Sequence, residues 1–289
     1  MVWIKVVERG FRNVRYRLSP EVFAVQTEGE PLAYHVVDEK TWESIISLPD
    51  DVSLQTSDHH GAELKEMWLI WGSWIEICDL WKVPRPMEPV DYGMMDSADE
   101  LQATALNCLY GFYRVAISCL RTGLELMTFT AYLQLEPGKS HFERWFKGKA
   151  PASFSNACDW LSGKNSHPDV TSLESNLMKR KKDTLFAKQT KNCQGGWVRR
   201  LYWQLSDFGH ARQRHTTAHL WDGSNGPIYV TESFRTVARL YEETAAAMWL
   251  LAKLAHPATS LPHIMRDIFV GKKGQVPAVA KEAYKSLFI

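Results

Sequence analysis

The sequence predicts a mainly α-helical protein, a helical bundle with a small N-terminal segment that contains β-strands. Apolar residues recur every three or four positions over most of the chain after residue 95, whereas apolar and polar residues alternate near the N-terminus. Apolar residues make up 45% of the 289 residues, which is enough for a sizeable core. A run of prolines separates the two parts: Pro84, Pro86 and Pro89.

The first 95 residues are predicted to form an α+β segment of unknown role. Alternating residues indicate short strands, with turns around Gly10 and Gly29. Helical spacing follows over residues 40–48 and 61–81, and the prolines end the second of these helices. A domain boundary is therefore expected near residue 95.

Residues 96–289 are predicted to form a helical domain. The pattern over residues 96–136 predicts one long helix, or two helices with a kink near Gly111 or Gly123. Shorter helices are predicted over residues 140–147, 153–161, 171–187, 197–219, 231–254, 261–269 and 276–288. The sequence WDGSNGP, at residues 221–227, predicts a turn that can cover a site.

Composition narrows the class of protein. The five cysteines are odd in number, widely spaced and form no CxxC motif, so we interpret them as core thiols. No apolar run is long enough to span a membrane, and the N-terminus becomes charged after seven residues, unlike a secretory signal. We therefore expect a cytoplasmic protein without a membrane association.

The net charge of the chain is only +1, but the charge is unevenly distributed. Residues 179–200 carry eight basic residues and one acidic residue. Such a stretch can track phosphates, or it can be a solvated helix end and loop. The candidate RNA-binding residues are Lys179, Arg180, Lys181, Lys182, Arg199 and Arg200.

The most informative stretch is HARQRHTTAH, which runs from His210 to His219. On a helix, Arg212, His215 and His219 lie close to one face, while His210 and Arg214 share a neighbouring face. Imidazoles transfer protons near neutral pH and guanidinium groups stabilise phosphate charge, so the cluster suits phosphodiester cleavage. In RNA the 2′-hydroxyl is a built-in nucleophile, and no metal or other cofactor is needed.

The stretch from Arg214 to His219 resembles the motif of the HEPN superfamily, an Arg followed by a polar residue, three further residues and a His. The resemblance covers about residues 101–254 and implies a helical bundle in which two protomers bring their motifs together. Many members are metal-independent endoribonucleases of toxin and antiphage systems. It implies that Arg214 and His219 are catalytic, with His215 at the polar position and Arg212 as a second phosphate ligand.

The same resemblance makes the helix at residues 101–135 the facing bundle helix. Arg121 and Glu125 are four residues apart on it and are predicted to pair with each other or with the Arg/His cluster, where Glu125 would orient a histidine. The expected partners are an RNA substrate, a second copy of the chain, and a regulatory protein or antitoxin. The N-terminal segment would then sense or regulate.

Other interpretations remain open. The Arg/His cluster can be a solvated helix end, which the helix dipole favours, or His215 and His219 can bind zinc with Asp222 as a third ligand. The chain can also be a non-catalytic RNA- or protein-binding module. The stripe of Trp68, Trp71, Trp74 and Trp81 can stack bases but is more typical of a core or interface, and Ser206 and Asp207 lack the context of a serine hydrolase.

Overall fold

A computed structural model of the chain describes residues 3–4, 16–17, 48–80, 87–137, 140–151, 153–163, 166–190, 194–209, 228–271 and 276–289. Its contacts divide the chain into two units, Met1–Glu43 and Ser44–Ile289. In the first unit the strands β1 (Trp3–Ile4) and β2 (Tyr16–Arg17) pair in an antiparallel manner. The remaining predictions for the first 47 residues lie outside the described part of the chain.

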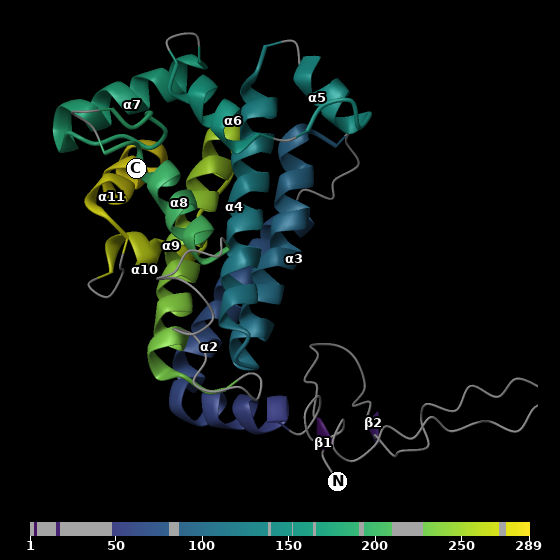
Figure 1. Ribbon diagram of the computed structural model, residues 1–289. Helices are drawn as coiled ribbons and strands as arrows, with labels where there is room; N and C mark the ends of the chain where they lie inside the picture. The colour runs from purple at the N-terminus through teal and green to yellow at the C-terminus, as the bar shows by residue number, and fades with distance from the viewer. Residues whose placement is uncertain are drawn as a thin grey trace, which may run out of the picture. The chain divides into compact units, whose positions relative to one another are not determined.

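The described part of the second unit is mainly helical, in agreement with the predicted class (Figure 1). Its described helices are α2 (Leu48–Leu80), α3 (Pro89–Leu109), α4 (Tyr113–Leu135), α5 (Ser140–Phe146), α6 (Phe154–Leu161), α7 (Pro168–Lys181), α8 (Trp197–Gly209), α9 (Thr231–Ala255), α10 (His263–Val270) and α11 (Ala278–Phe288). None of them is long and apolar enough to cross a membrane.

Helices α3 and α4 form an antiparallel hairpin, which is the most extensive helix pair of the unit. The predicted break near Gly111 is confirmed, because Gly111 has a φ of 78° between the two helices, a conformation that favours glycine. Gly93 on α3 meets Thr130 on α4 so closely that an added Cβ would lie 1.9 Å from the Thr130 hydroxyl oxygen. The hairpin therefore depends on a glycine at its tightest point.

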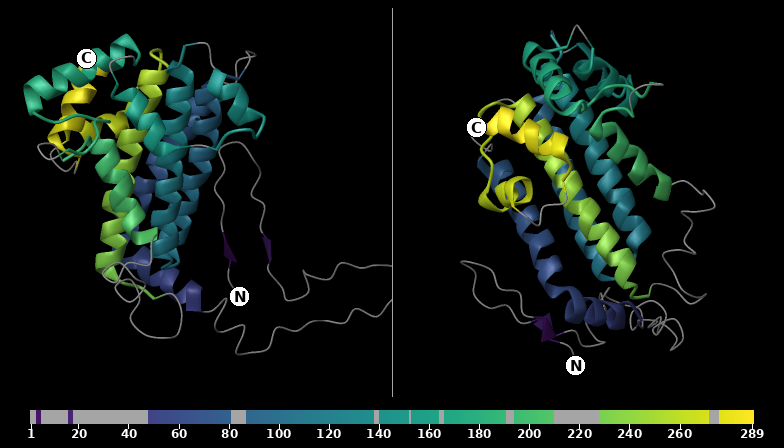
Figure 2. Two further views of the ribbon diagram at one scale, coloured as in Figure 1. Left: turned by 45° about the horizontal axis from the view of Figure 1, so that its top comes forward. Right: turned by 90° about the vertical axis from the view of Figure 1, so that its left-hand side faces the viewer.

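Helix α4 lies at the centre of the bundle, where it also contacts α6, α8 and α9 (Figures 1 and 2). Helix α2 packs against α3 and α9, and its Trp74 is fully buried. The Trp74 indole donates a hydrogen bond to the Met94 carbonyl (2.9 Å) and meets Trp249 edge to face. Of the tryptophan stripe, Trp74 thus belongs to the core, whereas Trp68 is 47% exposed.

The first half of α2 is helical although no helix was predicted over residues 49–60. Val52, Thr56 and His60 are all buried at intervals of four residues, so this half does have an inner face. Only Val52 is apolar, and the Thr56 hydroxyl is satisfied by the Val52 carbonyl (2.8 Å). The inner face was missed because its buried side chains are mostly polar.

The predicted boundary near residue 95 falls inside α3 rather than between two units. Helix α3 begins earlier than predicted because Pro89 occupies its first turn and Glu88 forms a capping box with Asp91. Helix α7 is shorter than predicted, since Lys182 adopts a left-handed conformation directly after it. Of the cysteines, Cys108 and Cys158 are buried thiols, as predicted.

Candidate functional site

The Arg/His cluster lies outside the described residues. This applies to His210, Arg212, Arg214, His215 and His219, and also to the alternative zinc ligand Asp222. The described residues on both sides of this segment nevertheless have defined contacts. Those before it belong to α8, and those after it lie just before α9. These contacts locate the two ends of the segment on the bundle.

The end of α8 is held at the beginning of α4. The Arg114 side chain donates a hydrogen bond from Nε to the carbonyl oxygen of Phe208 (3.2 Å), one residue before α8 ends. A guanidinium group is a favourable donor to a carbonyl toward the C-terminal part of a helix. Arg114 therefore ties this part of α8 to the beginning of α4.

The residue just before α9, Val230, is bound at the beginning of α4 by the neighbour of Arg114. The Val230 amide donates to the hydroxyl oxygen of Tyr113 (3.1 Å), which is the neighbour of Arg114 and is fully buried. Burial raises the pKa of Tyr113 to about 12, so this hydroxyl stays protonated. Gly111 leaves room for the carbonyl of Ile228, which would lie 2.9 Å from an added Cβ.

A chain of side-chain hydrogen bonds holds the residue between Ile228 and Val230. The Thr231 hydroxyl donates to the Tyr229 hydroxyl (2.9 Å), which lies 2.9 Å from Nε2 of His60. Nδ1 of His60 lies 3.3 Å from the Glu63 carboxylate, so the imidazole bridges Glu63 and the Tyr229 hydroxyl. His60 is only 3% exposed and stacks on Phe234.

A polar cluster joins α4 to the inner face of α8. Arg121 donates to the Tyr202 hydroxyl (2.7 Å) and to the Ser206 hydroxyl (3.0 Å), and lies 3.7 Å from Glu125. The Tyr202 hydroxyl donates to Glu125 (3.2 Å), and burial raises its pKa, so it remains a donor. Arg121 and Glu125 thus pair with each other, and they share Tyr202 on the helix that leads into the Arg/His segment.

The basic stretch does not form one continuous surface. Lys179, Lys181 and Lys182 are exposed at the end of α7, and the exposed Arg180 donates to Glu282 on α11 (2.7 Å). Basic residues in a last helical turn also interact favourably with the helix dipole.

The two arginines of α8 are engaged in the fold. Arg199 is 7% exposed, donates to the carbonyl of Phe186 (2.6 Å) and binds the Asp159 carboxylate. Arg200 forms a bidentate pair with Asp183 at 3.0 and 2.8 Å. These two guanidinium groups fix the loop between α7 and α8, and they are less available to a phosphate than the lysines.

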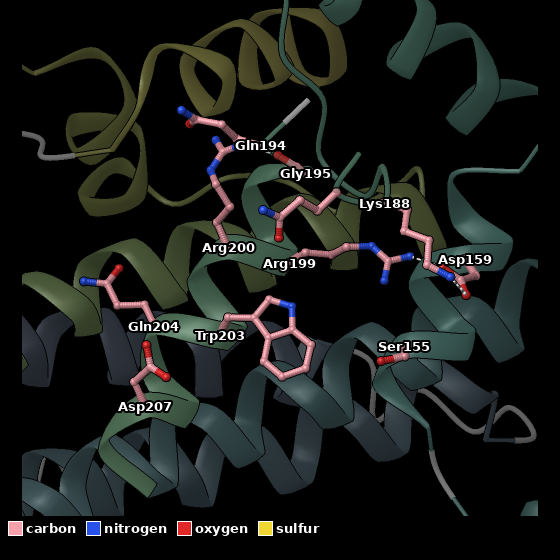
Figure 3. Close-up of a pocket in the computed structure, with 11 residues that line it drawn as sticks. Ser155, Asp159, Lys188, Gln194, Gly195, Arg199, Arg200, Trp203, Gln204 and Asp207 are labelled. Carbon is pink, nitrogen blue, oxygen red and sulfur yellow. Dashed lines mark hydrogen bonds and ion pairs between the residues drawn. The ribbon is translucent and has the colours of Figure 1, made fainter. Parts of the chain in front are cut away.

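A groove of about 690 Å³ lies along the outer face of α8 (Figure 3). Helix α6 and the loop between α7 and α8 complete its walls. In Figure 3 the indole of Trp203 lies in the middle of the view and Arg199 extends from α8 toward Asp159. The lining residues are Ser155, Asp159, Lys188, Gln189, Gln194, Gly195, Arg199, Arg200, Trp203, Gln204 and Asp207.

Comparison of the chain with protein-family models, with curated proteins and with solved structures finds no match. Among the described residues, no three His, Cys, Asp or Glu side chains form a group suited to a metal ion.

Sequence reasoning did not identify the anchoring residues Tyr113, Arg114 and Tyr229. No local pattern marks them, because their contacts join positions about 100 residues apart. Trp203 could have been identified from the sequence, because it is a tryptophan on the polar face of an amphipathic helix.

Proposed function

We propose that the protein is a metal-independent endoribonuclease whose active site is built from the Arg/His segment of two copies of the chain. The observation that carries the proposal is the common anchoring of the segment. Phe208 before it and Val230 after it are bound by the adjacent residues Arg114 and Tyr113. Two arginines and three histidines thus belong to a segment whose two ends are fixed at one end of the bundle.

The chemistry follows from these residue types. The 2′-hydroxyl of RNA attacks the adjacent phosphorus, the bond to the 5′-oxygen breaks, and the products are a 2′,3′-cyclic phosphate and a 5′-hydroxyl. One proton leaves the 2′-oxygen and one reaches the 5′-oxygen, and His219 is assigned to proton transfer. Arg214 and Arg212, with His215, would bind the scissile phosphate and stabilise its increased negative charge.

The resemblance of residues 214–219 to the HEPN motif gives independent support and extends the proposal to a homodimer. It also supports a toxin or antiphage defence role, in which a regulatory partner or antitoxin would restrain the activity. The described anchors are compatible with this, because Phe208 and Val230, which flank residues 210–227 in the sequence, are both bound at the beginning of α4.

The test is cleavage of single-stranded RNA by the purified protein in EDTA, comparing wild type with the His219→Ala variant. A His263→Ala variant is the matched control, because His263 lies on α10 with its side chain 85% exposed. We expect cleavage by wild type and by the control, loss of activity in His219→Ala, and cyclic phosphate ends. Equal cleavage by wild type and His219→Ala, or none by either on varied RNAs, would refute the proposal.

A second candidate is a non-catalytic RNA-binding module that uses the end of α7. Lys179, Lys181 and Lys182 are exposed there and can contact phosphates. Salt-sensitive RNA binding that is unaffected by His219→Ala, without cleavage, would favour this function. Activity that is lost in EDTA and restored by zinc would instead favour the alternative of a zinc-dependent hydrolase.

A further inference from the structure

The groove along α8 exposes an aromatic ring in an unusual setting. Trp197, Val198, Leu201 and Leu205 bury the inner face of α8, whereas Trp203 is 52% exposed on the opposite face. A single exposed apolar side chain is ordinary on a protein surface. Trp203 differs because it lies in the groove and is supported from one side by Tyr202, at 5.7 Å and 73° between the rings.

Three glutamines surround this groove, and all three are exposed. Among the described residues, no hydrogen-bond partner is found for the side-chain amides of Gln189, Gln194 and Gln204. A primary amide offers a donor and an acceptor side by side. That pattern complements the hydrogen-bonding edge of a nucleobase, which carries donors and acceptors in the plane of a ring.

The charges of the groove favour a ligand with little net charge at its centre and a phosphate at its rim. Asp159 and Asp207 offset much of the charge of Lys188, Arg199 and Arg200. Lys188 is 76% exposed and only 3.8 Å from Asp159, whose carboxylate is already bound by Arg199. Of the described cations in the groove, Lys188 is therefore the one whose ammonium group can most easily contact a phosphate.

We propose that this groove binds a nucleobase of single-stranded RNA. The base stacks on Trp203, a glutamine amide binds its edge, and Lys188 contacts the adjoining phosphate. A paired strand would not fit this arrangement, because a duplex covers both faces of each base. The inference rests on the proposed ribonuclease function for its choice of RNA, since α8 leads directly into the Arg/His segment.

The test measures binding of a mixed-sequence, single-stranded 2′-O-methyl oligonucleotide by fluorescence anisotropy. This probe lacks the free 2′-hydroxyl, so it reports binding without cleavage. We expect Trp203→Ala to weaken binding about 5- to 150-fold, as for the loss of one stacked base, and Trp203→Phe to retain most of it. Trp68→Ala is the matched control, because Trp68 is a similarly exposed tryptophan on α2 that also contacts one aromatic neighbour.

Lys188→Ala gives a second readout that does not depend on stacking. It should lower the slope of log Kd against log salt concentration by about 0.7, as for the loss of one phosphate contact to a single strand. Lys147→Ala, which removes another exposed lysine, should leave that slope unchanged.

Several results would overturn the inference. These are no binding by wild type, equal effects of Trp203→Ala and Trp68→Ala, equal binding of a duplex, and binding of a mononucleotide as tight as that of the oligonucleotide. A smaller sedimentation mass in Trp203→Ala would make Trp203 an interface residue instead. If cleavage depends on His219 but binding does not depend on Trp203, only the groove proposal is contradicted. If binding depends on Trp203 but no RNA is cleaved, only the ribonuclease proposal is contradicted.

Discussion

The Glu242→Gln variant should be more stable than wild type at pH 8. Burial, and then the negative charge of Glu66 on α2, raise the pKa of Glu242 on α9 from the ordinary 4.5 to about 7. The folded state therefore binds this proton more tightly than the unfolded chain does. The contribution to stability is fully present below about pH 4.5 and is lost as the pH rises through 7.

The magnitude follows from the two pKa values. The difference between 4.5 and about 7 corresponds to about 3 kcal/mol at full effect. Solvent screening of this partly exposed carboxylate reduces it to about 1–2 kcal/mol. A neutral glutamine avoids the cost, so the melting temperature of the variant at pH 8 should exceed that of wild type by about 2–8 °C.

Thermal unfolding of both proteins between pH 5 and pH 8 tests this prediction. The difference in melting temperature should grow with pH over that interval and be small at pH 5. A difference that is constant with pH, or a less stable variant at pH 8, would refute the reasoning.

The neighbouring Glu243→Gln variant is the matched control. Glu243 accepts a hydrogen bond from the Trp197 indole (2.8 Å) and pairs with Arg239 (3.0 Å). Loss of this charge should lower the melting temperature at pH 8. A rise in both variants would indicate a general effect of charge rather than the contact between Glu242 and Glu66.

Three further predictions concern packing and hydrogen bonds. Gly93→Ala should lower the free energy of unfolding, measured in urea, by about 2–3 kcal/mol. Adding Thr130→Ala to this variant should restore part of the loss, because it removes the nearest clashing atom. Arg199→Ala should cost about 2 kcal/mol in the same assay, since it removes the donor to the Phe186 carbonyl and leaves Asp159 with only the exposed Lys188 nearby; no loss would refute the structural role of Arg199. Tyr113→Phe should make hydrogen exchange of the Val230 amide about tenfold faster by removing its acceptor, and unchanged exchange would argue against this anchor.

Helices were predictable from the sequence where apolar residues recur every three or four positions and where helix-breaking residues mark both ends. The predicted helix at residues 231–254 is α9 (Thr231–Ala255), and that at residues 153–161 is α6 (Phe154–Leu161). Both bury a predominantly apolar face. The first half of α2 escaped prediction because Thr56 and His60 are buried through hydrogen bonds and ring stacking rather than through apolar character.

The candidate site was predictable only where its residues are neighbours on one helix. Arg121 and Glu125 are four residues apart, so their pairing follows from helical geometry. Their shared partner Tyr202 is 77 residues from Glu125, and the contact from Arg114 to Phe208 spans 94 residues. Such contacts depend on the packing of α4 against α8, which no local pattern encodes.

Helix α8 connects the two proposals, because its opposite faces have different roles. The inner face, with Tyr202 and Ser206, is bound by Arg121 on α4, and the Arg/His segment follows α8 in the sequence. The outer face, with Trp203, lines the groove. Changes to the outer face should therefore weaken RNA binding and raise KM while kcat is maintained. Changes to the inner face should displace the start of the segment, and they should lower kcat even where the RNA is bound normally.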